Sequence, residues 1–191
     1  MGIVKNVKVF GLEDSIKASK YPMSVDTESC TDVITNTTKR LGGCEKGTGH
    51  DQFLTGIVVQ FDLTFSLKAW TEAQRYHFLD FVSSQSTMHR IAKLFLLEQC
   101  NEYVDSEIIG VVQKLIENYN EDPIAENYLK VLYNIPTGFR LTARMTTNYR
   151  QLKTIYSQRK THKLPEWREF CGWVETLPMF KELVLNADNN N

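Results

Sequence analysis

The feature that most limits what this sequence can fold into is an alternation of apolar and polar residues within residues 55–65, beginning at Val59. A period of two residues predicts a β-strand with one buried face. Two further segments, Val4–Phe10 and residues 139–147, also have the composition of strands. Because strands need neighbours to complete their backbone hydrogen bonds, the three segments predict a small sheet.

Helical patterns occupy most of the remaining sequence. Ser106 can cap an amphipathic helix, and Pro123 and Pro165 can each begin another, because proline suits the first turn of a helix. The mixture of strands and helices predicts an α+β fold, with a small mixed or antiparallel sheet packed against several helices. The expected helices are residues 12–20, 67–97 in two pieces, 106–119, 123–133, 148–161, and a last one from Pro165 with Trp167, Phe170, Trp173 and Val174 inward.

The length of 191 residues, with 42% apolar and 24% charged residues, fits one globular domain over residues 1–185 and a disordered tail over residues 186–191. No apolar run reaches the roughly 18 residues of a membrane helix, and the first residues lack a basic-then-apolar signal segment. We therefore expect a cytoplasmic protein. Residues 21–51 show no sustained period, so a functional or mobile stretch is expected there.

Cysteine and motif patterns exclude several kinds of site. The four cysteines are scattered, without a C-x-x-C pair or zinc spacing, so we expect reduced thiols and no metal site. Residues 42–48 superficially resemble a phosphate loop, but no G-x-x-x-x-G-K-[ST] motif is present. The sequence also has no G-x-S-x-G motif and no evident carboxylate pair. An enzyme with this sequence would take its reactive chemistry from a cofactor.

Charge is unevenly distributed along a chain whose net charge is only −1. Residues 98–128 contain eight acids and one base, whereas residues 139–168 contain eight bases and one acid. A basic segment in a neutral protein favours a bound anionic ligand over general adhesion to nucleic acid. The alternative is that the two segments face each other as a network of ion pairs.

The expected helix over residues 148–161 carries polar groups on its apolar stripe. At 100° per residue, Asn148, Arg159 and His162 fall on the apolar face, and Arg150 lies on the opposite face. A buried arginine needs a compensating anion. Arg159 therefore predicts either a pair with a structural carboxylate or a contact with a ligand phosphate or heterocycle at the wall of a cleft.

The expected helix that begins at Trp70 is apolar nearly all round, which predicts burial and favours an oligomer that covers it. It nevertheless contains Arg75 and His77. Residues 83–87 are five consecutive Ser, Gln and Thr residues, which break or bend helices. Hydroxyls and amides flanked by arginines suit phosphate and base-edge contacts. His77 and His89 are either core histidines or site residues.

Residues 135–169 resemble the C-terminal half of the flavin-dependent thymidylate synthases. That family shows Leu-Pro, a Thr-bearing strand, Asn-x-Arg-x-Leu, an Arg eleven residues after the Asn, then His and Gln-Trp-Glu. The positions that match here are Asn148, Arg150, Leu152 and Arg159, with His162 one residue early and Trp167 near its expected place.

The family's other signature is Arg-His-Arg, then Ser, then Asn-Glu-x-Ser-x-Arg. This chain has Arg75 and His77 on either side of a tyrosine, followed by residues 83–90, in a similar order but with longer spacing and without the glutamate. The resemblance is therefore to a divergent member, and the chain is similar in style to bacteriophage proteins, which act in the host cytoplasm. The candidate counterparts in this stretch are Gln85, Ser86, and His89 or Arg90.

The resemblance implies a homotetramer that binds FAD and dUMP where subunits meet, with NADPH as reductant and methylenetetrahydrofolate as carbon donor. The implied reaction is flavin-dependent methylation of dUMP, or a related substitution at carbon 5 of a pyrimidine nucleotide. Arg159 would be catalytic, because it would stabilise charge as the ring is activated. The implied nucleotide contacts are Gln85, Ser86, Arg90 and Arg159, and the implied flavin contacts are Arg75, His77, Asn148, Arg150 and His162.

Two alternatives stay open. The missing glutamate favours a catalytically silent descendant of the same fold that binds a nucleotide or a protein. A nucleic-acid-binding protein that uses the basic segment ranks last, because the isoelectric point near 6.4 is low and no reading motif is present.

Overall fold

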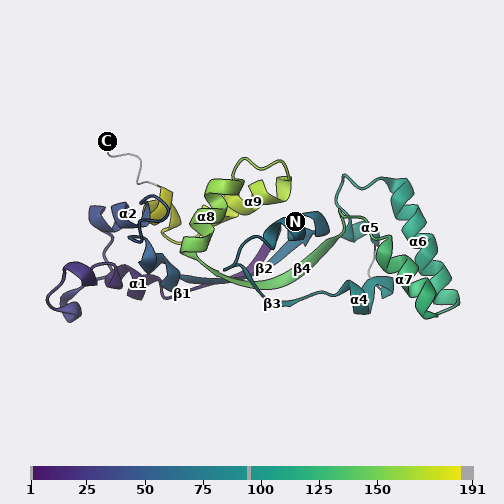
Figure 1. Ribbon diagram of the computed structural model, residues 1–191, viewed down its shortest axis with the longest axis horizontal. Helices are drawn as coiled ribbons and strands as arrows, with labels where there is room; N and C mark the ends of the chain where they lie inside the picture. Colours follow the sequence, from purple (N-terminus) through teal and green to yellow (C-terminus); the bar gives the residue numbers. More distant parts are fainter. Residues whose placement is uncertain (1, 94–95, 186–191) are drawn as a thin grey trace.

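The computed structural model describes residues 2–93 and 96–185, and the predicted disordered tail lies outside them. Its centre is a four-stranded antiparallel sheet with the strand order β1-β2-β4-β3 (Figure 1). The fold is α+β with a small antiparallel sheet, as the sequence predicts. The strands are β1 (Val4–Phe10), β2 (Val58–Ser66), β3 (Asp80–Ser84) and β4 (Arg140–Asn148).

Helices cover one face of this sheet and lie at both of its ends (Figure 1). Figure 1 shows α8 and α9 over one face, α1 and α2 at one end, and α6 and α7 as an arm at the other end. None of the helices in the described part of the chain is long and apolar enough to cross a membrane. The α-helices are α1 (Leu12–Ala18), α2 (Asn36–Gly42), α3 (Leu67–Ala73), α4 (Thr87–Arg90), α5 (Leu96–Gln99), α6 (Ser106–Glu121), α7 (Ala125–Tyr133), α8 (Tyr149–Arg159) and α9 (Pro165–Val174), and shorter turns are η1 (Tyr21–Met23), η2 (Thr27–Ser29), η3 (Gln52–Gly56), η4 (Ile91–Lys93) and η5 (Lys181–Leu185).

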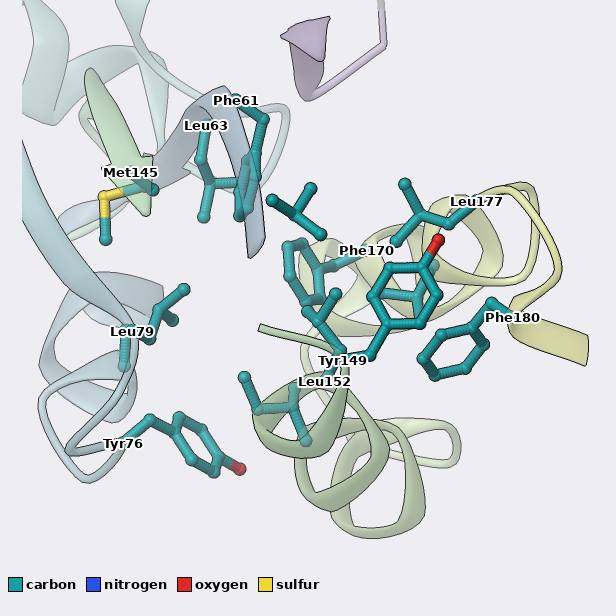
Figure 2. Close-up of a cluster of buried hydrophobic side chains, with 14 of the residues drawn as sticks. Phe61, Leu63, Tyr76, Leu79, Met145, Tyr149, Leu152, Phe170, Leu177 and Phe180 are labelled. Atoms are coloured by element: carbon teal, nitrogen blue, oxygen red, sulfur yellow. The ribbon is translucent and has the colours of Figure 1, made fainter. Parts of the chain in front are cut away.

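The main core lies between the sheet and the helices α8 and α9. The alternation in β2 places its apolar residues on the covered face, where Phe61 and Phe65 are fully buried. Phe61 packs against Phe170 of α9, with ring centroids 5.9 Å apart, and Figure 2 shows Leu152 of α8 in the same cluster. Trp167, also of α9, contacts Phe65 edge-on at 4.8 Å. The predicted inward face of the last helix is thus the face that holds α9 on the sheet.

A second, smaller core holds the helical arm. It consists of the buried residues Ile91, Ile109, Val112, Val131 and Phe139. The N-cap of α6 is Asp105, not Ser106 as the sequence suggested, because the Asp105 carboxylate accepts a hydrogen bond from the backbone N–H of Glu107 at 2.7 Å.

The prediction of helix over residues 67–97 is wrong in its middle part. The helix α3 ends at Ala73, and the chain returns as the edge strand β3, which pairs with β4. Phe78, Phe81 and Val82 are therefore not in a buried helix, and each is more than half exposed. Short runs of apolar residues fit a strand or a helix equally well, and here the unpaired edge of β4 decides in favour of the strand.

Residues 21–51 contain short helices despite their lack of a period. Thr35 and Thr38 form a reciprocal cap at the start of α2, in which each side chain bonds the other residue's backbone N–H. The four cysteines are free thiols, as expected. Gly42, the last residue of α2, lies against the backbone of Leu183 in η5.

The close approach at Gly42 gives a test of this packing. We expect Gly42→Ala to lower the free energy of unfolding by about 1–3 kcal/mol, because the added Cβ would overlap the Leu183 carbonyl oxygen and the backbone must shift. Gly110 of α6 is the matched control, since a Cβ there meets nothing within 4 Å. Gly110→Ala should raise stability by up to about 1 kcal/mol. Urea unfolding of both variants measures the difference, and equal effects would contradict this packing.

Candidate functional site

A cleft of about 860 Å³ runs along α8. Its other walls are residues 46–55, which include the start of η3, and residues 75–78, which follow α3. Asp51 is the one carboxylate among the described residues that line the cleft. The cationic side chains that line the cleft are Lys46, Arg75, Arg150, Lys153 and Arg159. This excess of positive charge favours the binding of an anion.

Asp51 ties one wall of the cleft to the other. Its carboxylate is almost fully buried and accepts hydrogen bonds from Arg150 Nε at 2.9 Å and Lys153 Nζ at 2.8 Å. Lys153 Nζ also donates to the carbonyl oxygens of Gly42 and Cys44 at the C-terminal end of α2. Burial acts to raise the pKa of Asp51, but the hydrogen bonds and charges of Lys153 and Arg150 outweigh burial and hold that pKa below its ordinary value.

Arg159 lies at the end of α8, where it is buried and enclosed by polar and aromatic groups. Its Nε donates to the hydroxyl of Tyr76 at 2.6 Å, and its NH1 pairs with Glu72 at 3.3 Å. The guanidinium also stacks over the ring of Trp167, 5.0 Å from the ring centroid. The structural carboxylate that the sequence allowed as one reading is therefore Glu72. Arg159 nevertheless also lines the cleft, so a ligand contact is open to it as well.

His162 lies behind Arg159 and is not among the residues that line the cleft. Its Nε2 is 2.7 Å from Arg159 NH1, and its Nδ1 faces the backbone N–H of Leu164 at 3.2 Å. Burial, and then the positive charge of Arg159, lower the pKa of His162. The imidazole is therefore neutral at physiological pH and adds no charge to the cleft.

The structure separates the site residues expected from the sequence into two groups. Gln85 continues the pairing of β3 with β4, because its side-chain oxygen accepts from the backbone N–H of Thr142 at 2.9 Å. Ser86 precedes α4 and Arg90 ends it, so neither lines the cleft in a single chain. The expected residues that do line the cleft together are Arg75, His77, Asn148, Arg150 and Arg159.

Several lining residues were not anticipated from the sequence. Asp51 lies in the segment without a period, and Lys153 lies on the same side of the helix as Arg150, opposite the apolar stripe. The spacing of Lys153 three residues after Arg150 was the available signal, because residues i and i+3 of a helix share a face. Tyr76 and Gln158 were also missed, although Tyr76 stands between Arg75 and His77 in the sequence.

The basic segment does not face the acidic segment as a network, so that alternative is wrong for the described residues. Arg140 and Glu102 form the one ion pair that joins the two segments, at 3.1 Å. The other pairs that the basic segment makes are to carboxylates outside the acidic segment: Asp62, Asp51 and Glu72.

No protein-family model matches this sequence, and neither does any curated protein sequence. Two crystal structures of the flavin-dependent thymidylate synthase ThyX from Helicobacter pylori, both with FAD and dUMP, are similar in structure. One is 16% identical with a TM-score of 0.70, and the match covers 95% of this chain and 98% of that chain. The other is 17% identical with a TM-score of 0.75, and covers 96% and 99%. The chain therefore has the fold of the flavin-dependent thymidylate synthases, and over nearly its whole length that of ThyX.

The buried carboxylate of Asp51 generates a pH-dependent prediction. Asp51→Asn should lower the free energy of unfolding by about 2 kcal/mol at pH 7, because Arg150 and Lys153 lose their counterion. The pKa of Asp51 is lowered in the folded state, so this contribution is complete above the unfolded value near 4 and disappears as the pH falls through the folded value. Unfolding curves at pH 7 and pH 3 measure it. If the difference in unfolding free energy between wild type and variant were the same at pH 7 and pH 3, the ion cluster of Asp51 would be contradicted.

Proposed function

We propose that this chain binds a flavin and a pyrimidine nucleotide and catalyses flavin-dependent methylation of dUMP, or a related substitution at carbon 5. The observation that carries the proposal is the cationic cleft on α8, in a fold whose solved relatives are complexes with FAD and dUMP. FAD and a nucleotide both carry phosphates, which guanidinium groups bind through paired hydrogen bonds.

The residues present fit such ligands. A volume of about 860 Å³ is within the range of cofactor sites, and the lining combines cations with amides and the aromatic side chains Tyr76 and Phe78. Bound flavin would supply the transfer of reducing equivalents, with NADPH and methylenetetrahydrofolate as co-substrates. The residues proposed to hold FAD are Arg75, His77, Asn148 and Arg150, with His162 supporting Arg159 from behind.

The chain's own side chains position the ligands and stabilise charge. Asp51 is bound by two cations and is a poor base, because its pKa is lowered. Arg159 is the residue proposed to stabilise charge on the pyrimidine ring, since it is fixed by Tyr76 and Glu72 at the end of the cleft. A preorganised cation in a site of low dielectric stabilises charge that develops in the transition state more strongly than a cation in water would.

Assembly into a homo-oligomer, with a tetramer as the expected state, would complete this site. Gln85, Ser86 and Arg90, the proposed nucleotide contacts, lie along β3 and α4, away from the cleft of their own chain. The strand β3 is an edge strand whose five residues are all exposed. An exposed apolar edge of this kind is a typical subunit contact. The apolar residues along it are Phe78, Phe81, Val82 and Met88.

The second candidate function is ligand binding without turnover. It is favoured by the stretch over residues 83–90, which has no carboxylate and does not line the cleft. A glutamine or serine there can bind a nucleotide by hydrogen bonds but cannot take up a proton at neutral pH. Nucleotide binding without product would support this second function.

The side chain of Arg75 gives the sharpest test of ligand binding. It is 71% exposed and pairs with Glu72 at 3.6 Å, so Arg75→Ala should leave the melting temperature nearly unchanged. We expect the wild-type protein to bind FAD, seen as yellow absorbance, and Arg75→Ala to bind FAD about tenfold more weakly. Arg40→Ala on α2, an exposed arginine away from the cleft, is the control.

Turnover is measured on the same preparations as tritium release from 5-tritiated dUMP, with NADPH, methylenetetrahydrofolate and mass identification of the product. Wild-type protein that binds neither FAD nor dUMP at millimolar concentration would refute the proposed function. Equal FAD affinity of Arg75→Ala and Arg40→Ala would remove Arg75 from the site.

The assembly is tested by a charge placed on the edge strand. Val82→Lys should dissociate the oligomer, because Val82 is 58% exposed on β3 and a lysine there opposes edge pairing. Val111→Lys on α6, where Val111 is 54% exposed, is the control and should leave the oligomer intact. Light scattering measures both masses, and a wild-type monomer of 22.1 kDa at micromolar concentration would contradict the assembly.

A further inference from the structure

Arg159, Tyr76 and Gln158 form a hydrogen-bond chain whose direction is fixed by chemistry. Arg159 Nε is 2.6 Å from the Tyr76 hydroxyl. A guanidinium can only donate, so the hydroxyl oxygen accepts this bond. The phenolic proton is then free for Gln158 Oε1, which accepts it at 3.1 Å. Figure 2 shows the Tyr76 hydroxyl directed toward the helix that carries Leu152, which is α8.

This chain determines which end of the Gln158 amide is available to a ligand. With Oε1 bound to Tyr76, the free end is the NH2 group, which only donates. If the amide were reversed, two donors would face the Tyr76 oxygen and the phenolic proton would lose its acceptor. Burial raises the pKa of Tyr76, so the phenol keeps its proton at neutral pH.

The group that Gln158 presents to a ligand in the cleft is therefore a hydrogen-bond donor. Gln158 is exposed and lines the cleft, and no described residue accepts a hydrogen bond from its Nε2. The Glu72 carboxylate, which pairs with Arg159 at 3.3 Å, is engaged by three cations: Arg159, Arg75 and Lys68. A carbonyl oxygen of a ligand is stabilised beside the Gln158 NH2 group, whereas an amino group in the same place would face a donor.

We infer that Gln158 is a specificity-determining residue that donates a hydrogen bond to the carbonyl oxygen on carbon 4 of a pyrimidine nucleotide. Uracil carries an acceptor oxygen at this position, and cytosine carries an amino donor. Tyr76 is a positioning residue, because its hydroxyl fixes the Gln158 amide as well as the Arg159 guanidinium. The inference rests on the proposed function, since it assumes that a pyrimidine nucleotide occupies the cleft.

The test compares the dissociation constants of dUMP and dCMP for the full-length protein with FAD added. We expect wild type to prefer dUMP by about tenfold or more, because a donor that faces an amino group is left unpaired. Gln158→Leu should reduce this preference to about twofold or less. Gln158→Glu should reverse it, since a carboxylate accepts from the amino group of cytosine. Tyr76→Phe should reduce the preference, because the amide can then turn.

The matched control is Gln113→Leu, on the exposed side of α6, which should keep the wild-type ratio of the two constants. If Gln158→Leu keeps the wild-type ratio while both nucleotides bind, the inference is wrong and the proposed function stands. Equal affinity of wild type for dUMP and dCMP would likewise contradict the inference and leave the proposed function standing. If wild type binds neither nucleotide, the proposed function fails and the inference falls with it.

Discussion

The antiparallel pairing of β2 with β4, from Val58 opposite Asn148 to Ser66 opposite Arg140, determines where the candidate site lies. Asn148 ends β4 and caps α8, because its side-chain oxygen accepts from the backbone N–H of Gln151. The direction of α8 is thus set at the last residue of the strand. The cations on α8 reach the cleft because this pairing holds the start of the helix against the sheet.

The parts of the fold that could be predicted are those whose signal is local. The alternation that begins at Val59 identified β2, because one face of that strand is fully buried. The edge strand β3 could not be found in this way. All of its residues are exposed, so neither of its faces needs apolar side chains and its sequence does not alternate. Its position depends on the free edge of β4, which lies about 60 residues further along the chain.

The site was predictable where its residues follow one helix or one turn. The helical period identified Asn148 and Arg159, and the structure places both on the cleft. Asp51 could not be found, because its partner Arg150 is 99 residues away and nothing in the surrounding sequence marks a buried carboxylate. The helical period also could not show that Arg150 lines the site. Its face of α8 is polar, but residues 46–55 lie opposite it and make it one side of the cleft.

The carboxylate shared by Arg150 and Lys153 constrains how this protein can change during evolution. Loss of either cation leaves Asp51 with one partner, and loss of both leaves a buried charge with none, so the two substitutions have effects that do not add. Lys153 also donates to the carbonyl oxygens at the C-terminal end of α2. A substitution at position 153 therefore alters both the cleft and the end of that helix. Epistasis of this kind favours lineages in which residues 51, 150 and 153 are inherited as a set.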